Sequence, residues 1–182
     1  GYKESTRRAL LNHHCEVTVF PHHTPAKDIV AYQPDGILVS EGPGDPAENG
    51  ALIQELKALI ESGIPLFGIG LGHQLLALAS GFQVEKLPHG HRGANYPAKE
   101  VTTGRTYITS QNHGYVVVSD SIDQRVAQPW FVNVNDGTNE GLLYIDRPIF
   151  SVQFQPRGGA KDTAALFDRF IKLMEETRHA VR

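Results

Sequence analysis

Hydrophobic and polar positions along the chain follow two periods in turn, one typical of helices and one typical of strands. Residues 1–14 have the spacing of a helix, and residues 15–20 then alternate as a half-buried strand does. A short helix is predicted over 24–32 and a short buried strand over 37–39, which ends in a loop rich in glycine and proline. Helices and strands therefore succeed one another from the start of the chain.

The same succession continues into the middle of the chain. A helix is predicted over 51–60, an apolar strand over 65–69, and a second helix that opens at Leu71, with Gly70 at the tight turn between them. Strands that alternate with helices favour a mainly parallel sheet with helices on both faces.

Beyond Gly81 the pattern changes to short strands separated by polar turns, which favours a small antiparallel extension of the sheet. These strands are predicted over 84–87, 106–110, 115–118, 130–134 and 141–145. A last buried strand over 149–154 and a closing helix over 163–174 complete the pattern. The sequence shows no repeat, low-complexity tract or clear linker, so we expect one domain over 1–182.

Composition narrows the class of protein and its setting. Hydrophobic residues make up 40% of the 182 positions and charged residues 20%, which is typical of a globular domain that folds in water. The net charge of −3 argues against a nucleic-acid partner, and no apolar run approaches the ~20 residues that span a membrane. Cys15 is the single cysteine, which excludes an intrachain disulfide and suits a reducing compartment. We therefore expect a cytoplasmic protein.

The histidines and the cysteine form no group that predicts a metal or cofactor site. Histidine pairs at 13–14 and 22–23 stand about 25 Å apart if the strand between them rises ~3.3 Å per residue, so one ion cannot bind both pairs. His89 and His91 form too short a motif to indicate a set of ligands. Cys15 is expected to be a structural thiol at the start of an early strand.

Several short stretches form a combination that resembles a known family. They are Ser40–Pro46, Gly68–Gln74, His91–Asn95, Ser110–Tyr115 and Ser151–Phe154. In this order they closely resemble the glutaminase domain of the small subunit of carbamoyl phosphate synthetase, a class I (triad-type) glutamine amidotransferase. The resemblance covers essentially the whole chain. It implies a flavodoxin-like open sheet, mostly parallel, and we expect the sheet's first strand and the family's N-terminal domain to be absent here.

The resemblance also implies an activity and a partner. Members of the family hydrolyse glutamine to glutamate and ammonia, and pass the ammonia to a synthetase large subunit for arginine or pyrimidine biosynthesis. An elbow cysteine attacks the amide, a histidine takes its proton, and a glutamate orients the histidine. By resemblance, the residues that line the glutamine pocket are Gly42, Gly44, Leu71, Gln74, Asn112, Gly114 and Tyr115. Among these, Gly44 and Leu71 would donate the N–H groups of the oxyanion hole.

All three catalytic positions depart from the family pattern. Gly70 replaces the cysteine, Gln155 the histidine and Arg157 the glutamate, while Glu41 replaces the more usual asparagine of the glycine loop. Glycine offers no thiolate, and a side-chain amide is not a base near neutral pH. Arg157 adds a positive charge where a carboxylate would stabilise an imidazolium ion. These changes remove the mechanism, whether they arose naturally or by design.

We therefore expect a glutaminase-type domain that keeps a pocket for L-glutamine and does not hydrolyse it. One alternative is a structural or regulatory partner of the large subunit whose pocket no longer binds glutamine. Another is an enzyme with an unrecognised nucleophile. His73 and His113 lie beside pocket positions and are each expected to be structural. Glycine tolerates strained turns at low cost, so Gly70 can preserve the elbow after the nucleophile is lost.

Overall fold

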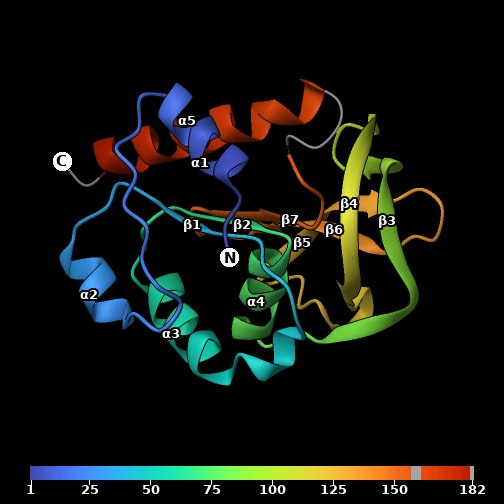
Figure 1. Ribbon diagram of the computed structural model, residues 1–182, viewed down its shortest axis with the longest axis horizontal. Coiled ribbons are helices and arrows are strands. Elements are labelled where there is room, and N and C mark those ends of the chain that lie inside the picture. The colour runs from blue at the N-terminus through green and yellow to red at the C-terminus, as the bar shows by residue number, and fades with distance from the viewer. Residues whose placement is uncertain (157–160, 181–182) are drawn as a thin grey trace.

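Seven strands form one open, mixed sheet in a computed structural model of the chain, which describes residues 1–156 and 161–180 (Figure 1). Across the sheet the strands follow the order β1-β2-β7-β6-β5-β3-β4. The strands are β1 (Ile37–Val39), β2 (Leu66–Ile69), β3 (Val84–Glu100), β4 (Thr106–Val117), β5 (Ala127–Asn133), β6 (Asn139–Tyr144) and β7 (Ile149–Val152). The α-helices are α1 (Glu4–Asn12), α2 (Ala26–Ala31), α3 (Gly50–Glu61), α4 (Leu71–Ala79) and α5 (Ala165–Ala180).

The parallel part of the sheet contains β1, β2 and β7. Leu66 of β2 is in register with Ile37 of β1 on one side and with Ile149 of β7 on the other. Parallel strands need a crossover connection, and α3 supplies it between β1 and β2. All four residues of β2 are buried, as expected for a strand that is covered on both faces.

The antiparallel part extends from β7 through β6 and β5 to a long hairpin of β3 and β4. The hairpin pairs Val84 with Val117 at one end and Lys99 with Thr106 at the other. β3 pairs with β5 only over its last residues, from Ala98 to Glu100. Along the rest of its length β3 pairs with β4 and not with β5, and the hairpin lies beside β5 and β6 in Figure 1.

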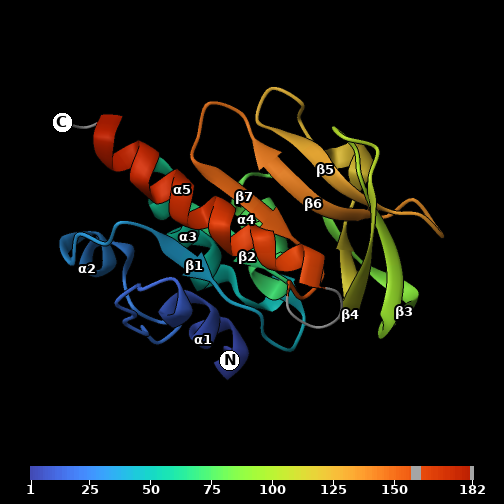
Figure 2. The same cartoon turned by 90° about the horizontal axis from the view of Figure 1, so that it is seen from above.

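Helices cover both faces of the sheet. α1 and α5 lie on one face, and α3 and α4 lie on the other, with α2 beside α3 (Figures 1 and 2). Side chains of β2 alternate between these two sides, because successive strand residues point to opposite faces. Leu66 packs in the core beneath α3 and α4, and Phe67 packs in the core beneath α1 and α5.

Aromatic rings form the centre of the core beneath α5. Phe67 and Phe150 stack with their centroids 4.5 Å apart, and Phe167 and Phe170 of α5 contact the Phe67 ring from the helix side. The opposite core is mostly aliphatic. These two cores hold the carboxyl end of β2 rigidly between helices, and that end carries the elbow.

The expected fold class is confirmed as an open α/β sheet with helices on both faces, but parallel pairing is less extensive than predicted. Two strand pairs are parallel and four are antiparallel. The difference arises because the strands after Gly81 join the same sheet directly, and because residues 106–117 form one continuous strand where two were predicted. The predicted antiparallel extension is thus larger than the parallel part.

The prediction of a strand over residues 15–20 is wrong. Residues 15–18 alternate between half-buried and exposed positions, but Val19 is exposed, and the whole segment belongs to no strand. β1 pairs with β2 alone and is an outer strand of the sheet. Alternation determines which way side chains point, but a strand also needs the backbone of a neighbour to pair with.

A groove of about 930 Å³ lies beside β1 and is largely apolar in its lining. Side chains of α1, the 14–22 segment, β1, α3 and α5 contribute to its walls. Within the described residues, no helix has the length and apolar character that crossing a membrane requires.

Candidate functional site

The turn between β2 and α4 has Gly70 at its tip, the residue that the resemblance leads us to expect at the nucleophile position. Gly70 has φ +57° and ψ −111°, a backbone conformation that residues with a side chain rarely adopt. Its N–H donates to the Val152 carbonyl at 2.9 Å, and its carbonyl accepts from the Gln74 N–H at 3.2 Å. These bonds attach the turn to β7 and to the first turn of α4. The strained elbow expected from the sequence is therefore present.

Any side chain at position 70 would point toward the glycine loop. A Cβ atom built there lies 3.4 Å from Glu41 Cβ and 3.9 Å from the Gln153 carbonyl oxygen. Both contacts are ordinary van der Waals distances, so the site has room for a small side chain. The obstacle to a side chain at this position is the backbone conformation, not space.

Helix α4 approaches the end of β1 so closely that only glycine fits at the contact. A Cβ atom on Gly72 would lie 2.0 Å from the Val39 carbonyl oxygen. A Cβ atom on Gly68 would lie 2.6 Å from a methyl group of Leu76. The glycines around the elbow thus set the distance between α4 and the sheet.

The glycine loop, residues 40–46, lies against the start of α4. A Cβ atom on Gly42 would lie 2.8 Å from Leu71 Cδ2, so these two predicted pocket residues are neighbours. Gly44 has φ +98° and open space around it. Thr6 of α1 donates a hydrogen bond of 2.9 Å to Glu41 Oε1, while Glu41 Oε2 is buried without a partner among the described residues.

Side-chain hydrogen bonds connect the elbow helix, β4 and the glycine loop. Gln74 Nε2 donates to the Tyr115 carbonyl and to Gln153 Oε1, both at 2.9 Å. The Tyr115 hydroxyl donates to Asp45 Oδ2 at 3.0 Å, and this hydrogen bond raises the pKa of the Tyr115 phenol. Sequence reasoning missed Asp45 and Gln153 as partners, although both lie inside the stretches that carry the resemblance.

The remaining predicted pocket residues lie on β4. Asn112 is exposed, and Gly114 is half-buried beside the guanidinium group of Arg92, which would lie 3.6 Å from a Cβ atom at position 114. Asn112 is in register with Arg92 on β3. The structure thus brings Gly42, Leu71, Gln74 and Tyr115 into one connected group, with Asn112 and Gly114 on the adjoining strand.

Gln155 is the residue that the resemblance leads us to expect at the position of the family's catalytic histidine. This residue is half-buried just after β7, and its N–H donates to the Ser110 carbonyl at 2.9 Å, next to the β4 stretch. Arg157, expected at the third catalytic position, lies outside the described residues. Gln155 is held close to β4 by its backbone hydrogen bond.

His73 is a core residue, as expected. Its side chain is completely buried, and Nδ1 forms a hydrogen bond of 2.8 Å with Ser151 Oγ of β7. Burial lowers the pKa of His73 to about 3, so the imidazole is neutral near pH 7. It joins α4 to the sheet behind the elbow.

Cys15 does not have the environment of an activated nucleophile. Its thiol is half-buried in the 14–22 segment, and burial, together with the nearby Asp35 carboxylate, raises its pKa. A nucleophilic cysteine needs the opposite shift, because the thiolate is the reactive form. The groove beside β1 is lined by Cys15 and includes Leu71 as its one predicted pocket residue.

We expect Gln74→Ala to destabilise the fold by about 2–3 kcal/mol. The substitution leaves Gln153 Oε1 without this donor, which costs about 1–3 kcal/mol, and removes one of two partners of the Tyr115 carbonyl, which keeps its contact with His113 Nδ1. Urea denaturation measures the change, with Gln54→Ala on the exposed face of α3 as the control. Equal midpoints for the two variants would contradict the bridging role of Gln74.

The chain is similar to known proteins in family, in sequence and in structure. Residues 1–173 match the family described as glutamine amidotransferase class-I. The arginine-specific small chain of carbamoyl phosphate synthase from Kluyveromyces lactis is 48% identical over 185 residues, which cover 98% of this chain and 45% of the relative. The pyrimidine-specific small chain from Halalkalibacterium halodurans is 46% identical over 181 residues, which cover 98% of this chain and 50% of the relative.

This chain spans about half the length of the curated relatives it matches. A crystal structure of a glutamine amidotransferase from Methylobacillus flagellatus superimposes with a TM-score of 0.66 at 16% identity, over 98% of this chain and 89% of that chain. A crystal structure of a protein from Thermoplasma acidophilum, described as part of a GMP synthase, superimposes with a TM-score of 0.85 at 19% identity. That superposition covers 99% of this chain and 92% of the other. Both proteins share the fold described above.

Proposed function

The chain belongs to the class I glutamine amidotransferase family, and from this premise we propose that it is the glutaminase-type domain of a carbamoyl phosphate synthase small chain that no longer hydrolyses glutamine. Its partner is the synthetase large subunit, and its compartment is the cytoplasm. The glycine at the tip of an otherwise complete elbow is the observation that carries this proposal.

L-Glutamine is the ligand that the pocket would bind. The residues proposed to line it are Gly42, Gly44, Leu71, Gln74, Asn112, Gly114 and Tyr115. Hydrogen bonds from Gln74 to β4 and from Tyr115 to Asp45 support this assignment, because they hold the elbow helix, the glycine loop and β4 together. The backbone N–H groups of Gly44 and Leu71 are the proposed donors to the amide oxygen.

Hydrolysis fails at its first step in this arrangement. The amide carbon of glutamine would meet no thiol at position 70, so no thioester forms. Gln155 cannot accept the proton that a nucleophile would release. Glu41 adds a further obstacle: its Cβ lies beside the elbow, and a negative charge on this residue would repel the oxyanion of a tetrahedral intermediate.

A structural or regulatory partner without glutamine binding is the second candidate function. One observation favours it: both N–H bonds of the Gln74 side chain are used inside the protein, so its amide nitrogen is not free to hold a ligand. Calorimetry with L-glutamine separates the two functions. Binding that weakens at least tenfold in Asn112→Ala supports the pocket, and absence of binding supports the second candidate.

We expect no ammonia release from glutamine by the chain as it stands, compared with a heat-denatured control. Gly70→Cys alone should also release none, because the base is still an amide. The combination Gly70→Cys, Gln155→His, Arg157→Glu supplies nucleophile, base and orienting carboxylate, and ammonia release should become measurable. Adding Glu41→Asn should increase it, since a neutral side chain then faces the oxyanion.

The matched control for this series is Gly70→Ala in the Gln155→His, Arg157→Glu background. Alanine brings the same strain at the elbow as cysteine but no thiol, so it should release no ammonia. Release by the unmodified chain, or by Gly70→Cys alone, would show that the catalytic site has been assigned to the wrong residues.

A further inference from the structure

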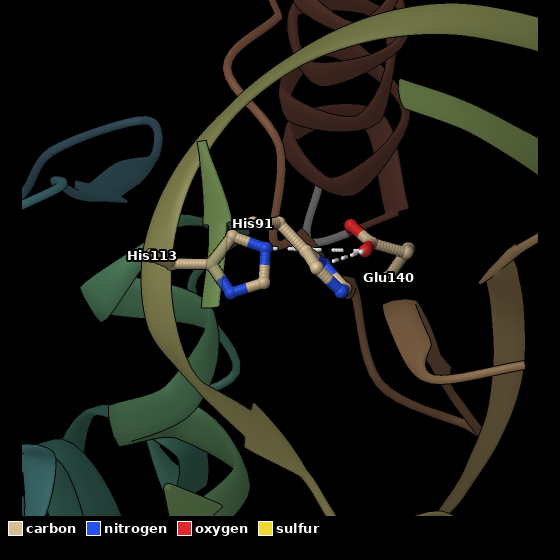
Figure 3. A group of neighbouring side chains, drawn as sticks. All are labelled: His91, His113 and Glu140. Atoms are coloured by element: carbon tan, nitrogen blue, oxygen red, sulfur yellow. Dashed lines mark ion pairs between the residues drawn. The ribbon is translucent and has the colours of Figure 1, made fainter. Parts of the chain in front are cut away.

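Three side chains that can bind metal converge beside the β3–β4 hairpin, outside the residues used in the proposed function. His91 of β3 and His113 of β4 are directly opposite in register, and Glu140 of β6 reaches them from the sheet (Figure 3). His91 Nδ1 lies 3.4 Å and His113 Nε2 lies 3.9 Å from Glu140 Oε1. One ligand atom from each residue falls within 4.8 Å of the other two.

The outer nitrogen of each imidazole already has an acceptor. His91 Nε2 lies 2.8 Å from an Asp136 carboxylate oxygen, and His113 Nδ1 lies 2.9 Å from the Tyr115 carbonyl oxygen. Both acceptors require a proton on the nitrogen that faces them, so a neutral ring keeps its lone pair on the inner nitrogen. Histidine ligands of metals are oriented in the same way, by a carboxylate or a backbone carbonyl behind the ring.

Acceptor atoms therefore face one another in the middle of the cluster. His113 Nε2 lies 3.1 Å from Gln111 Oε1, which is a second acceptor beside the Glu140 carboxylate. Two side-chain amides lie near the centre. Gln111 Nε2 donates to Thr109 Oγ1 at 3.1 Å, and Asn133 Nδ2 makes long contacts of 3.3 Å to Glu140 Oε1 and 3.4 Å to His91 Nδ1. Converging acceptors repel one another unless a cation lies between them.

Glu140 provides an independent observation that points to a metal ligand role. Its side chain is fully buried, and Oε2 has no hydrogen-bond partner among the described residues. The imidazole rings are nearly buried as well, with 9% of the His91 side chain and 6% of the His113 side chain exposed. A buried carboxylate oxygen without a donor is costly, and coordination to a metal would satisfy it.

We propose that His91, His113 and Glu140 bind one divalent transition-metal ion, with Zn²⁺ as the representative ion. Two imidazoles and one carboxylate are a common ligand set for Zn²⁺, and they leave a fourth position for water. Tetrahedral Zn²⁺ separates its ligand atoms by about 3.3 Å, close to the 3.4 Å between His91 Nδ1 and Glu140 Oε1 and shorter than the 3.9 Å between His113 Nε2 and Glu140 Oε1. Rotation of the imidazole side chains would bring the two histidine nitrogens to the same separation.

The metal would fasten the hairpin to the sheet. β3 pairs with β5 only from Ala98 to Glu100, so the part of the hairpin around His91 and His113 is not paired with the sheet directly. Glu140 belongs to β6, inside the sheet, and one ion bound by all three residues joins the two parts.

The alternative is a simple ion pair of protonated His91 with Glu140, whose carboxylate raises the pKa of His91.

Calorimetric titration of the tag-free chain with Zn²⁺ tests the proposal. One ion should bind per chain, and His113→Gln and Glu140→Gln should each weaken binding at least tenfold. His89→Gln is the matched control, because His89 lies on the same strand and is exposed. Unchanged affinity in His113→Gln and Glu140→Gln, or loss in His89→Gln, would overturn the site.

A spectroscopic measurement on the unmodified chain covers the case in which a variant fails to fold. Co²⁺ in place of Zn²⁺ should give the visible absorption of a tetrahedral ion, which added Zn²⁺ removes. No such absorption with stoichiometric Co²⁺ would show that the cluster is an ion pair without a metal. Neither measurement involves glutamine, so the result is independent of the proposed function.

Discussion

Gly72→Ala should destabilise the fold by about 4 kcal/mol or more, enough to leave much of the protein unfolded. The added methyl group would lie 2.0 Å from the Val39 carbonyl oxygen, which belongs to the backbone and cannot rotate away. Relief requires α4 to move from the end of β1, and this movement separates the elbow from the sheet. Urea denaturation followed by circular dichroism measures the loss.

Gly50→Ala is the control for this substitution. Gly50 opens α3, and a Cβ atom there meets nothing within 4 Å. Alanine at that position should be neutral or slightly stabilising, because it lowers the conformational entropy of the unfolded chain. If the free energies of unfolding of Gly72→Ala and Gly50→Ala agree within about 1 kcal/mol, the close approach of α4 to β1 is contradicted.

Acid should destabilise the protein through His73, by about 3 kcal/mol between pH 6.5 and pH 4. The pKa of His73 is about 3 in the folded state, against about 6.5 when unfolded, so the unfolded chain binds the proton first. The stabilisation is complete above pH 6.5 and falls by about 1.4 kcal/mol for each pH unit below it, until the folded state also takes the proton near pH 3.

His73→Leu isolates this contribution. Leucine removes the titrating ring and the hydrogen bond to Ser151, so the variant should be less stable than the unmodified chain at pH 7. The difference in unfolding free energy between the unmodified chain and His73→Leu should shrink as the pH falls. It should change sign if the His73–Ser151 hydrogen bond stabilises the fold by less than the loss of His73 stabilisation in acid. His22→Gln, at an exposed histidine, should keep the pH dependence of the unmodified chain. A difference that stays constant from pH 7 to pH 4 would refute the assignment.

Local features of the site could be predicted from the sequence. Glycine at the turn between an apolar strand and a helix indicated the elbow, and Gly70 has the positive φ that such a turn needs. His73 was expected to be structural and is buried against Ser151. Both conclusions depend on residues close together in the chain, where propensity and side-chain volume determine the outcome.

Long-range pairing could not be predicted. The alternation at 15–20 could not reveal that no strand lies beside it, and nothing local indicated that residues 106–117 form one strand. His91, His113 and Glu140 lie on three strands, and only the register of the hairpin brings them together. Spacing of histidines along the sequence therefore argued against a metal, whereas the fold creates a possible site for one.

The position of β7 affects how the chain can fold. β7 lies between β2 and β6 and is the one strand that joins the parallel part of the sheet to the antiparallel part. It is also the last strand along the described residues, at 149–152. During synthesis, β2 emerges long before β7 and keeps an open edge until β7 arrives, whereas β6 precedes β7 by only a short turn. Folding of the whole sheet is therefore a late and slow event, because contacts between distant residues cost loop entropy before they stabilise. The exposed edges in that interval are where chaperones would act and where aggregation would begin.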